Sequence, residues 1–399
     1  MEGFFSKEQF QQSGVSKKTS CISCGLFKQC NSPKITPKGE GKLRIMNIAE
    51  FPSHADDLEN NFFLGKARIL KRLYSKYGID MDEDCINIAA LRCHPEEIIP
   101  KKMGRYLESC RKYVFQAIEK YQPHVIVLFG NYALQSVIGH RWKRDLGTIN
   151  KWRGFVIPDQ QIKAFICPTF SPAFIYDQEP YYESIFEADI KRISEVVHKQ
   201  FPVYKEPQIE IVKSLKVLDS IKSGSAAFDY ETTGIKPYNA GHKIVCASVA
   251  PSADHAYVFM MPEEKKKQNP FLRFVKNQNV NKIAYNMKFE DNWTNVILKR
   301  KVASWRWDGQ IASHLIDNRP DITSLKFQTY VTFGIIDYDS EISPFLKAKD
   351  ANSMNKLIEY IKNPDNAKKV MHYCGMDSVL TYRLMEVQTG ILGYDFLPF

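Results

Sequence analysis

Apolar residues along this chain fall into short runs, separated by longer stretches in which they recur with helical spacing. Runs typical of buried strands occur at residues 43–48, 123–130 and 226–228. Near the other end, a helical stripe at i, i+3, i+7 and i+14 is formed by Asp377, Leu380, Leu384 and Ile391. The alternation predicts an α/β fold class. It also predicts that the stripe faces the core, with an acid on it.

A boundary between two domains is expected at residues 201–208. This segment contains two prolines, follows a helical pattern over residues 185–199 and precedes a new α/β pattern. A chain of 399 residues is long enough for two domains. We therefore expect one domain over residues 1–200 and a second over residues 209–399.

The composition is that of an ordinary globular protein, with 44% hydrophobic and 25% charged residues. The net charge of +10 permits a polyanionic partner such as nucleic acid without requiring one. The sequence has no apolar run of about 18 residues and no signal-peptide pattern at Met1. We expect a cytoplasmic protein without membrane contact, in which nine cysteines serve as metal ligands or buried side chains.

Two acids one residue apart, Asp229 and Glu231, directly follow the apolar run at residues 226–228. On a strand, side chains at i and i+2 share a face, so both carboxylates project together. Converging carboxylates repel each other unless a cation lies between them, and oxygen ligands suit Mg²⁺ or Mn²⁺. Taken alone, the pair is equally consistent with a solvated strand edge.

A third acid, Asp377, lies four residues after Tyr373, so both side chains share one face of the predicted helix. Because this face is expected to be buried, Asp377 needs a partner such as a metal ion. Three segments in this order, residues 228–234, 282–291 and 373–384, resemble the motifs of the DEDD-type 3′→5′ exonucleases in their tyrosine-bearing subclass. They are most similar to the proofreading domain of family A DNA polymerases, which implies a ribonuclease H-like fold.

The resemblance implies hydrolysis of a phosphodiester by two Mg²⁺ or Mn²⁺ ions. Asp229 would bridge both metals, Glu231 and Asp377 would complete one site, and Glu290 would support the second through water. The second motif departs from the family, which usually has aspartate where this chain has Glu290, and Asp291 follows immediately. The spacing from the preceding part of the motif favours Glu290.

Three further residues of these motifs have implied roles. Tyr373 would orient the attacking water, and Asn286 and Lys288 would position the phosphate or the scaffold of the site. For Lys288, an ordinary solvated lysine is an equal alternative.

Four cysteines in the first half suggest a metal centre. Cys21 and Cys24 form a CxxC motif, and Cys93 and Cys110 follow at long spacing. Four thiolates hold either zinc or a [4Fe–4S] cluster, and spacing alone does not choose between them. Single cysteines are more often small core residues, which is the role expected of Cys30, Cys85 and Cys167.

The segments around these cysteines resemble the iron–sulfur uracil-DNA glycosylases of family 4 over residues 15–200. The matching segments are residues 43–53, 62–67, 91–95, 123–130, 151–154 and 169–172. The resemblance implies a three-layer α/β/α sandwich and assigns the four cysteines to a [4Fe–4S] cluster. It places Glu50 at the acid of the first motif and Phe63 at the aromatic ring that stacks on uracil.

Two positions depart from that family. Its uracil-reading asparagine falls on Ala89, and its histidine before proline in the last motif falls on Ser171. Alanine cannot read a base edge, and serine cannot carry the charge of an imidazolium. We therefore expect the loss of ordinary uracil excision and a DNA-binding or assembly role, with His54 and Asn87 as the available substitutes.

Taken together, the chain resembles the front part of certain large-phage DNA polymerases, in which a glycosylase-like domain precedes an exonuclease. This implies a proofreading exonuclease module that acts on a single-stranded or frayed primer 3′ end of DNA, with a separate DNA polymerase polypeptide as partner. The aromatic residues Tyr394, Phe396 and Phe399 would pack locally or dock that partner. The alternatives are a DNA-repair enzyme that removes an altered base and trims the strand, and a non-catalytic DNA-binding scaffold.

Overall fold

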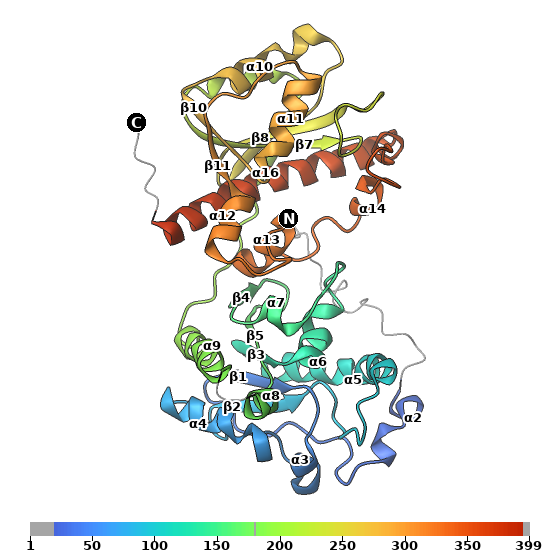
Figure 1. The fold of residues 1–399 in the computed structure, drawn as a ribbon, viewed down its shortest axis with the longest axis vertical. Coiled ribbons are helices and arrows are strands. Elements are labelled where there is room, and N and C mark those ends of the chain that lie inside the picture. The colour runs from blue at the N-terminus through green and yellow to red at the C-terminus, as the bar shows by residue number, and fades with distance from the viewer. Residues whose placement is uncertain (1–19, 179–180, 394–399) are drawn as a thin grey trace. The chain divides into compact units, whose positions relative to one another are not determined.

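The computed structural model of this chain describes residues 20–178 and 181–393, so Tyr394, Phe396 and Phe399 lie outside the described residues. The chain divides into two compact units (Figure 1). The first runs to Val203 and includes Tyr330–Ile336, whereas the second comprises Tyr204–Thr329 and the residues from Asp337 onward. The break between Val203 and Tyr204 falls within the expected linker. The short return of the chain to the first unit was not anticipated from the sequence.

The first unit is built on a five-stranded sheet with the order β2-β1-β3-β5-β4. Four strands are parallel and one edge strand is antiparallel; they are β1 (Ile45–Ala49), β2 (Cys85–Ala89), β3 (Val125–Phe129), β5 (Ala164–Thr169) and the antiparallel β4 (Ile157–Asp159). The parallel strands are almost completely buried, because helices cover both faces of the sheet.

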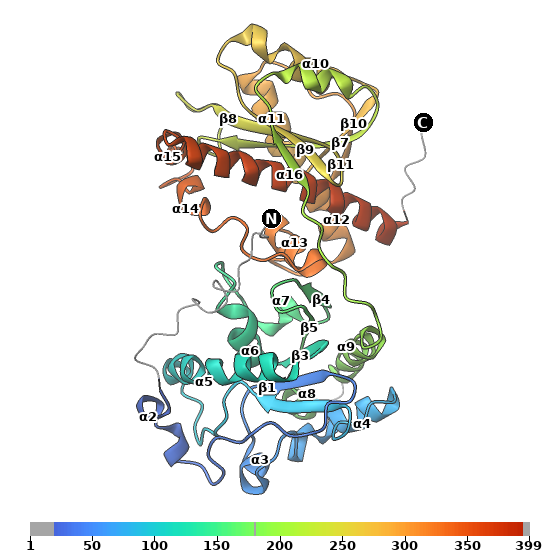
Figure 2. The same ribbon diagram turned by 180° about the vertical axis from the view of Figure 1, so that it is seen from behind.

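The helices of the first unit form two outer layers (Figures 1 and 2). On one face α4 (Arg68–Lys76) packs against α9 (Glu183–Val196), and on the other α5 (Pro100–Tyr121) packs against η3 (Gln135–Gly139), which continues α6 (Asn131–Leu134). The shorter elements are α2 (Cys21–Cys24), η1 (Leu26–Lys28), α3 (His54–Glu59), η2 (Gly65–Ala67), α7 (Ile149–Trp152) and α8 (Pro172–Asp177). The predicted three-layer α/β/α sandwich is confirmed.

The second unit contains a six-stranded sheet with the order β11-β10-β7-β8-β9-β6. Three strands form an antiparallel meander: β7 (Gly224–Thr232), β8 (Ile244–Ser252) and β9 (His255–Met260). Next to β7, on the side away from β8, lie the parallel strands β10 (Val280–Ala284) and β11 (Trp305–Asp308). At the opposite edge, β6 (Gln208–Ile211) pairs with β9 in parallel. This is the strand arrangement expected of a ribonuclease H-like domain, so the predicted α/β class is confirmed here too.

The two faces of this sheet have separate cores. On one face Phe228 and Tyr230 of β7 pack with side chains of α10 (Asn269–Lys276) and α11 (Met287–Ile297). Because side chains alternate along a strand, Asp229 and Glu231 point to the opposite face. That face is crossed by α16 (Pro364–Leu392). The other elements are η4 (Leu215–Ser220), η5 (Lys265–Gln268), α12 (Gly309–Ile316), α13 (Leu325–Phe333), α14 (Ser343–Leu346) and α15 (Leu357–Tyr360).

The predicted stripe on α16 is correct over most of its length. Asp377, Leu380 and Leu384 are buried, but Ile391 is 61% exposed, so the prediction that it faces the core is wrong. The reason is length: a helix of 29 residues extends about 43 Å, whereas six strands span only about 25 Å. The last turns therefore lie beyond the sheet. Among the described residues, no helix combines the length and apolar character needed to span a membrane.

Candidate functional site

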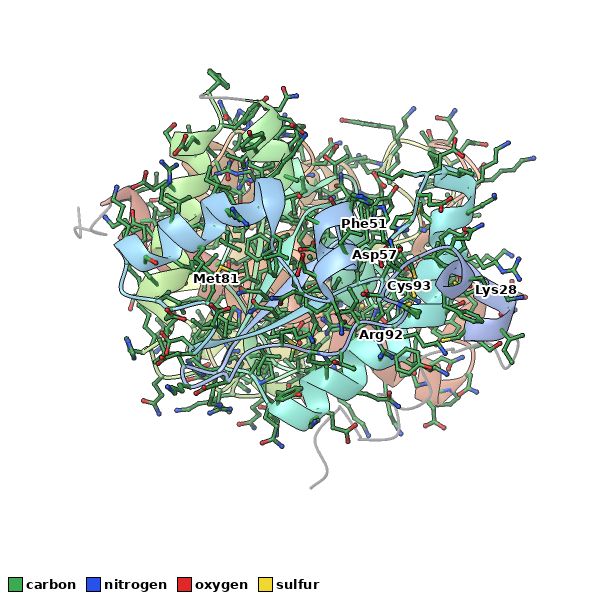
Figure 3. The ribbon with its side chains drawn as sticks, turned by 90° about the horizontal axis from the view of Figure 1, so that it is seen from below. Lys28, Phe51, Asp57, Met81, Arg92 and Cys93 are labelled. Carbon is green, nitrogen blue, oxygen red and sulfur yellow. The ribbon has the colours of Figure 1, made fainter. Side chains whose placement is uncertain are left out.

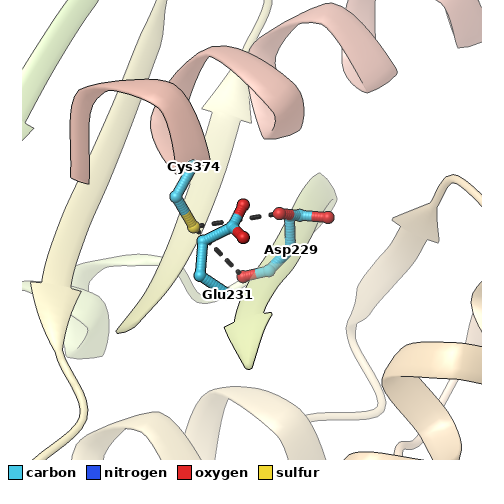
Figure 4. Close-up of side chains that lie close together, drawn as sticks. All are labelled: Asp229, Glu231 and Cys374. Carbon is cyan, nitrogen blue, oxygen red and sulfur yellow. Dashed lines mark hydrogen bonds between the residues drawn. The ribbon is translucent and has the colours of Figure 1, made fainter. Parts of the chain in front are cut away.

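Acidic side chains from separate segments of the second unit meet where α16 crosses β7. The possible ligand atoms of Asp229, Glu231 and Cys374 all lie within 4.8 Å of one another (Figure 4). Asp377 follows Cys374 by three residues on α16 and is likewise buried. The strand contributes two acids on one face and the helix contributes the third, as the two periodicities predict.

Electrostatic coupling shows that the acids share one site. Burial raises the pKa of Asp229 well above its usual value, and the charge of Asp377 raises it further. Burial also raises the pKa of Glu231, and Asp229 is the largest charge acting on it. Glu290 of α11 behaves in the same way, since burial and then Asp229 raise its pKa. The partly buried Asp229 and three buried carboxylates, from three segments, therefore repel one another.

The geometry favours Glu290 over Asp291 as the acid of the second motif. Glu290 is only 2% exposed, and its Oε2 atom is buried without a hydrogen-bond partner. Asp291 instead accepts a hydrogen bond of 2.9 Å from Nε1 of Trp305. A buried carboxylate oxygen without a donor is costly unless a cation or water completes it. The donor set of this site, mainly carboxylate oxygens, fits a hard divalent cation.

Tyr373 lies on the buried face of α16 and is 7% exposed. Burial raises the pKa of its phenol well above the usual value, and the charges of Asp377 and Glu231 add to this effect. The hydroxyl therefore remains protonated at neutral pH and can donate a hydrogen bond.

Cys374, the next residue, was not identified from the sequence. Its thiol donates to Ser248 Oγ at 3.4 Å. The same thiol lies 3.8 Å from Asp229 Oδ2, next to the acidic side chains (Figure 4).

Sequence reasoning also missed Lys326 and Tyr338. The Tyr338 hydroxyl donates a hydrogen bond of 2.6 Å to Oδ1 of Asp377, and the Lys326 ammonium forms an ion pair with the same oxygen. Lys326 lies in the first turn of α13, and Tyr338 lies in the chain that follows this helix. Neither residue belongs to a recognisable motif. No local pattern reveals contacts formed over such sequence distances.

Asn286 and Lys288 lie where β10 passes into α11. Asn286 adopts a left-handed backbone with φ of 70°, and its amide donates to Asp308 Oδ1 at 3.1 Å. The next amide, of Met287, donates to Asp308 Oδ2 at 2.9 Å, so Asp308 caps α11. Lys288 is exposed on the first turn of this helix.

In the first unit, three segments bring the four predicted cluster cysteines close together. Cys21 and Cys24 form α2, which contacts α5, the helix that carries Cys110, while Cys93 follows β2. Burial raises the pKa of Cys93 and Cys110 to about 12, and the charge of Cys24 contributes at both thiols. Figure 3 shows Cys93 near Asp57, on the side of the domain toward Lys28.

Four thiol side chains are a donor set for either a zinc ion or a [4Fe–4S] cluster. Zinc with Zn–S bonds of about 2.3 Å would gather its four sulfurs within about 4 Å of one another. Among the described residues, the one group of three or more such ligands within 4.8 Å is Asp229, Glu231 and Cys374. In the part of the chain that the structure describes, no three of the four thiols therefore lie within 4.8 Å of one another.

The expectation for the remaining cysteines of this unit holds in part. Cys85 and Cys167 are core residues, 0% and 2% exposed. The expectation for Cys30 is wrong, because its side chain is only partly buried and its thiol donates to the Phe27 carbonyl at 3.8 Å. Asp57 positions this segment by accepting hydrogen bonds of 2.8 Å from the amides of Asn31 and Ser32.

Glu50 directly follows β1 and interacts with the start of α6. Its Oε1 accepts a hydrogen bond of 3.1 Å from the Tyr132 amide, and burial raises its pKa. A Cβ atom at Gly130 would lie 2.5 Å from the Glu50 carboxyl carbon, and the φ of Gly130 is +87°. Only glycine is therefore compatible with this contact. Glu50 therefore links the end of β1 to the start of α6.

The residue expected to stack on uracil has a strained backbone. Phe63 has φ of 59°, and its ring meets the edge of Phe129 at a centroid distance of 5.4 Å. A bulky side chain in the left-handed region costs energy and is typical of functional sites. Ser171 precedes α8 at its N-cap without forming a side-chain cap, and Ala89 ends β2 in a buried position.

Asn87 is not available to replace the missing base-reading asparagine. Its Oδ1 accepts from Asn47 Nδ2 at 2.9 Å, and its Nδ2 donates to the Met81 carbonyl at 3.0 Å. Tyr74 completes this buried network with a hydrogen bond of 2.8 Å to Asn47. His54 is exposed, with its ring 5.9 Å from that of His94.

Comparison with known proteins finds relatives of the N-terminal half. Residues 36–188 match the Uracil DNA glycosylase superfamily. The type-4 uracil-DNA glycosylase of Archaeoglobus fulgidus is 26% identical over 189 residues, covering 46% of this chain and 91% of that protein. The type-4 enzyme of Saccharolobus solfataricus is 26% identical over 180 residues, covering 44% and 82%. The N-terminal half is thus similar to these glycosylases.

Solved structures of nucleases are also similar to the chain. Brucella melitensis NrnC with bound Mg²⁺ covers 47% of this chain and 81% of its own, with 17% identity and a TM-score of 0.34. The catalytic core of RRP6 from Trypanosoma brucei covers 47% of each chain, with 12% identity and a TM-score of 0.36.

Proposed function

We propose that residues 209–399 form a metal-dependent 3′→5′ exonuclease that removes nucleotides from the 3′ end of DNA. The observation that carries this proposal is the convergence of the partly buried Asp229 with three buried carboxylates, from β7, α11 and α16, beside a protonated tyrosine. An acidic cluster of this kind is unstable without cations, and buried residues with perturbed pKa values are concentrated at functional sites.

The carboxylates would divide between two metal ions. Asp229, Glu231 and Asp377 would hold one divalent cation, and Asp229 and Glu290 would support the second. Bound there, two Mg²⁺ or Mn²⁺ ions would activate a water molecule and stabilise the leaving 3′-oxygen of the phosphodiester. Because burial raises the pKa of Asp229, Glu231 and Glu290, metal binding would release protons from the site.

The protein's own groups would orient the reactants. The Tyr373 hydroxyl, which stays protonated, would donate a hydrogen bond and hold the attacking water in line with the phosphorus. The exposed ammonium of Lys288 would contact the phosphate backbone, and the turn at Asn286 would place it beside the site.

A digestion assay tests this proposal directly. A 5′-labelled DNA strand with a mismatched 3′ end should be shortened from that end in the presence of Mg²⁺ or Mn²⁺, and a chelator should stop the reaction. Asp229→Ala should lower the rate by about three orders of magnitude or more, because it removes the carboxylate shared by both metals. Undiminished digestion by this variant would contradict the assignment.

For the first unit we propose DNA binding without ordinary uracil excision. Ala89 and Ser171 occupy the base-reading and charge-stabilising positions of the related glycosylases, and the amide of Asn87 is committed to the core. A [4Fe–4S] cluster held by Cys21, Cys24, Cys93 and Cys110 would tie α2 to the loop after β2 and to α5. Proofreading for a polymerase on the same particle stays a prediction, testable by mixing the chain with the polymerase of its source on a sizing column.

A further inference from the structure

We propose that Lys326 is an additional catalytic residue of the exonuclease site, whose ammonium group binds the scissile phosphodiester and offsets the negative charge that accumulates during hydrolysis. The inference rests on the proposed function and extends it to a residue outside the three motifs. It is carried by the position of Lys326 inside the acidic site.

Several contacts hold the Lys326 ammonium in place. It forms an ion pair with Oδ1 of Asp377 and donates to the Tyr338 hydroxyl at 2.6 Å. It also lies 4.0 Å and 4.3 Å from the ring centroids of Tyr338 and Tyr373, within the range of cation–π attraction. The Lys326 side chain is only 11% exposed. This charge is therefore fixed next to the tyrosine that would orient the attacking water.

The influence of Lys326 reaches beyond its ion pair with Asp377. Its charge lowers the pKa of Asp229 and of Glu231, which opposes the rise in pKa that burial causes. Both hydrogen bonds at Asp377 end on Oδ1, and among the described residues no hydrogen bond is assigned to Oδ2. The carboxylate can therefore offer Oδ2 to a metal while Oδ1 remains with Lys326 and Tyr338.

Charge counting shows why a lysine is useful in this position. Two divalent cations would balance four ionised carboxylates, so the loaded site would be neutral without Lys326. The phosphodiester brings one negative charge, and loss of a proton from the attacking water to solvent brings another. As the new P–O bond forms and the bond to the 3′-oxygen breaks, that oxygen leaves and takes up a proton. A fixed cation stabilises the extra charge without reorganisation.

The same charge should weaken metal binding, since it would repel a divalent cation held by the neighbouring carboxylates. Removing it therefore has opposite effects on two measurable quantities. Lys326→Met should bind Mn²⁺ about tenfold more tightly or better in the absence of DNA. Its single-turnover rate at saturating Mn²⁺ should fall about 100-fold, as for the loss of one donor to a transition state. A residue that merely orients Asp377 would weaken both.

The test uses the full-length chain, with Mn²⁺ affinity measured by titration calorimetry and rates measured on a 5′-labelled strand. Lys326→Arg retains the charge, so it should keep wild-type Mn²⁺ affinity and recover at least a tenth of the rate, roughly. Lys267→Met is the control, because Lys267 forms an exposed ion pair with Glu264 at 2.9 Å, and this variant should behave as wild type. Thermal unfolding of each variant shows whether it is folded.

The outcomes separate this inference from the proposed function. Tighter Mn²⁺ binding with slower cleavage in Lys326→Met, reversed in Lys326→Arg, supports it. Unchanged cleavage, or weaker Mn²⁺ binding in the Met variant, overturns it while the exonuclease stands. If the Met variant does not fold, an Arg variant that folds but cleaves no DNA overturns it. If wild type binds no Mn²⁺ and degrades no DNA, the proposed function fails and the inference with it.

Discussion

Replacing Asp229 with asparagine should make the metal-free protein more stable and the enzyme inactive. Asparagine has nearly the same shape as aspartate, so the packing around Cys374 and β8 is preserved. What changes is charge, because Asp229 is the largest charge acting on both Glu231 and Glu290. The substitution removes the repulsion at the centre of the cluster, and it also removes the ligand proposed to be shared by two metal ions.

The magnitude follows from the geometry. The ligand oxygens of Asp229 and Glu231 lie within 4.8 Å of each other. At an effective dielectric constant of about 20, two unit charges at that distance repel by about 3 kcal/mol. Protonation already relieves part of this repulsion in the wild type, so we expect a net stabilisation of about 1–3 kcal/mol at pH 8. For a unit of this size that raises the midpoint of thermal unfolding by roughly 3–10 °C.

The assay compares thermal unfolding of wild type and Asp229→Asn in a chelator and in Mg²⁺. Wild type should gain stability on adding Mg²⁺, whereas the variant should start higher and gain much less. Glu263→Gln is the matched control: its side chain is 93% exposed and 3.6 Å from Lys243, so the midpoint should move by roughly 1 °C or less. A variant that is less stable than wild type in chelator, yet still responds fully to Mg²⁺, would refute this reasoning.

Four further predictions concern the acidic site and the first unit. Glu290→Gln should abolish most metal-dependent cleavage, whereas Asp291→Asn should cleave at a rate near that of wild type. Asp291→Asn should also lose about 1 kcal/mol of stability, because its hydrogen bond with Trp305 is weakened. Cleavage rates and unfolding midpoints measure the two effects. Because the site carboxylates have a raised pKa when folded, the folded protein binds more protons than the unfolded chain. Stability in chelator should therefore fall as the pH rises from about 4, and the gain from Mg²⁺ should grow, in midpoints measured from pH 5 to 9. Anaerobically purified protein should be brown and should contain four iron atoms per chain by metal analysis. Cys110→Ser should lose the iron, and Cys30→Ser should keep it. A colourless protein with one zinc ion per chain would contradict the cluster. A uracil-containing strand should bind with an affinity that falls steeply with salt in a filter-binding assay and should yield no abasic sites under alkali, whereas efficient base release would show an active glycosylase.

The sequence by itself determined the features that depend on local periodicity. Alternation along β7 placed Asp229 and Glu231 on one face, and four-residue spacing placed Tyr373 and Asp377 together on the buried side of α16. The apolar runs at residues 43–48 and 123–130 became central parallel strands. In each case the periodicity of the strand or helix sets the direction in which a side chain points. This direction can therefore be predicted without knowing which distant residues pack nearby.

Tertiary structure decided which distant groups meet. Only packing brought Lys326 and Tyr338 onto Asp377, committed Asp291 to Trp305 so that Glu290 faces the site, and set the thiol of Cys30 beside Cys93. Packing also left Ile391 exposed, because α16 is longer than the sheet that it crosses. Local sequence specifies the face on which a side chain lies. Which residue contacts that side chain depends on how segments tens of residues apart pack together. The repeat of apolar residues within one element does not specify this packing.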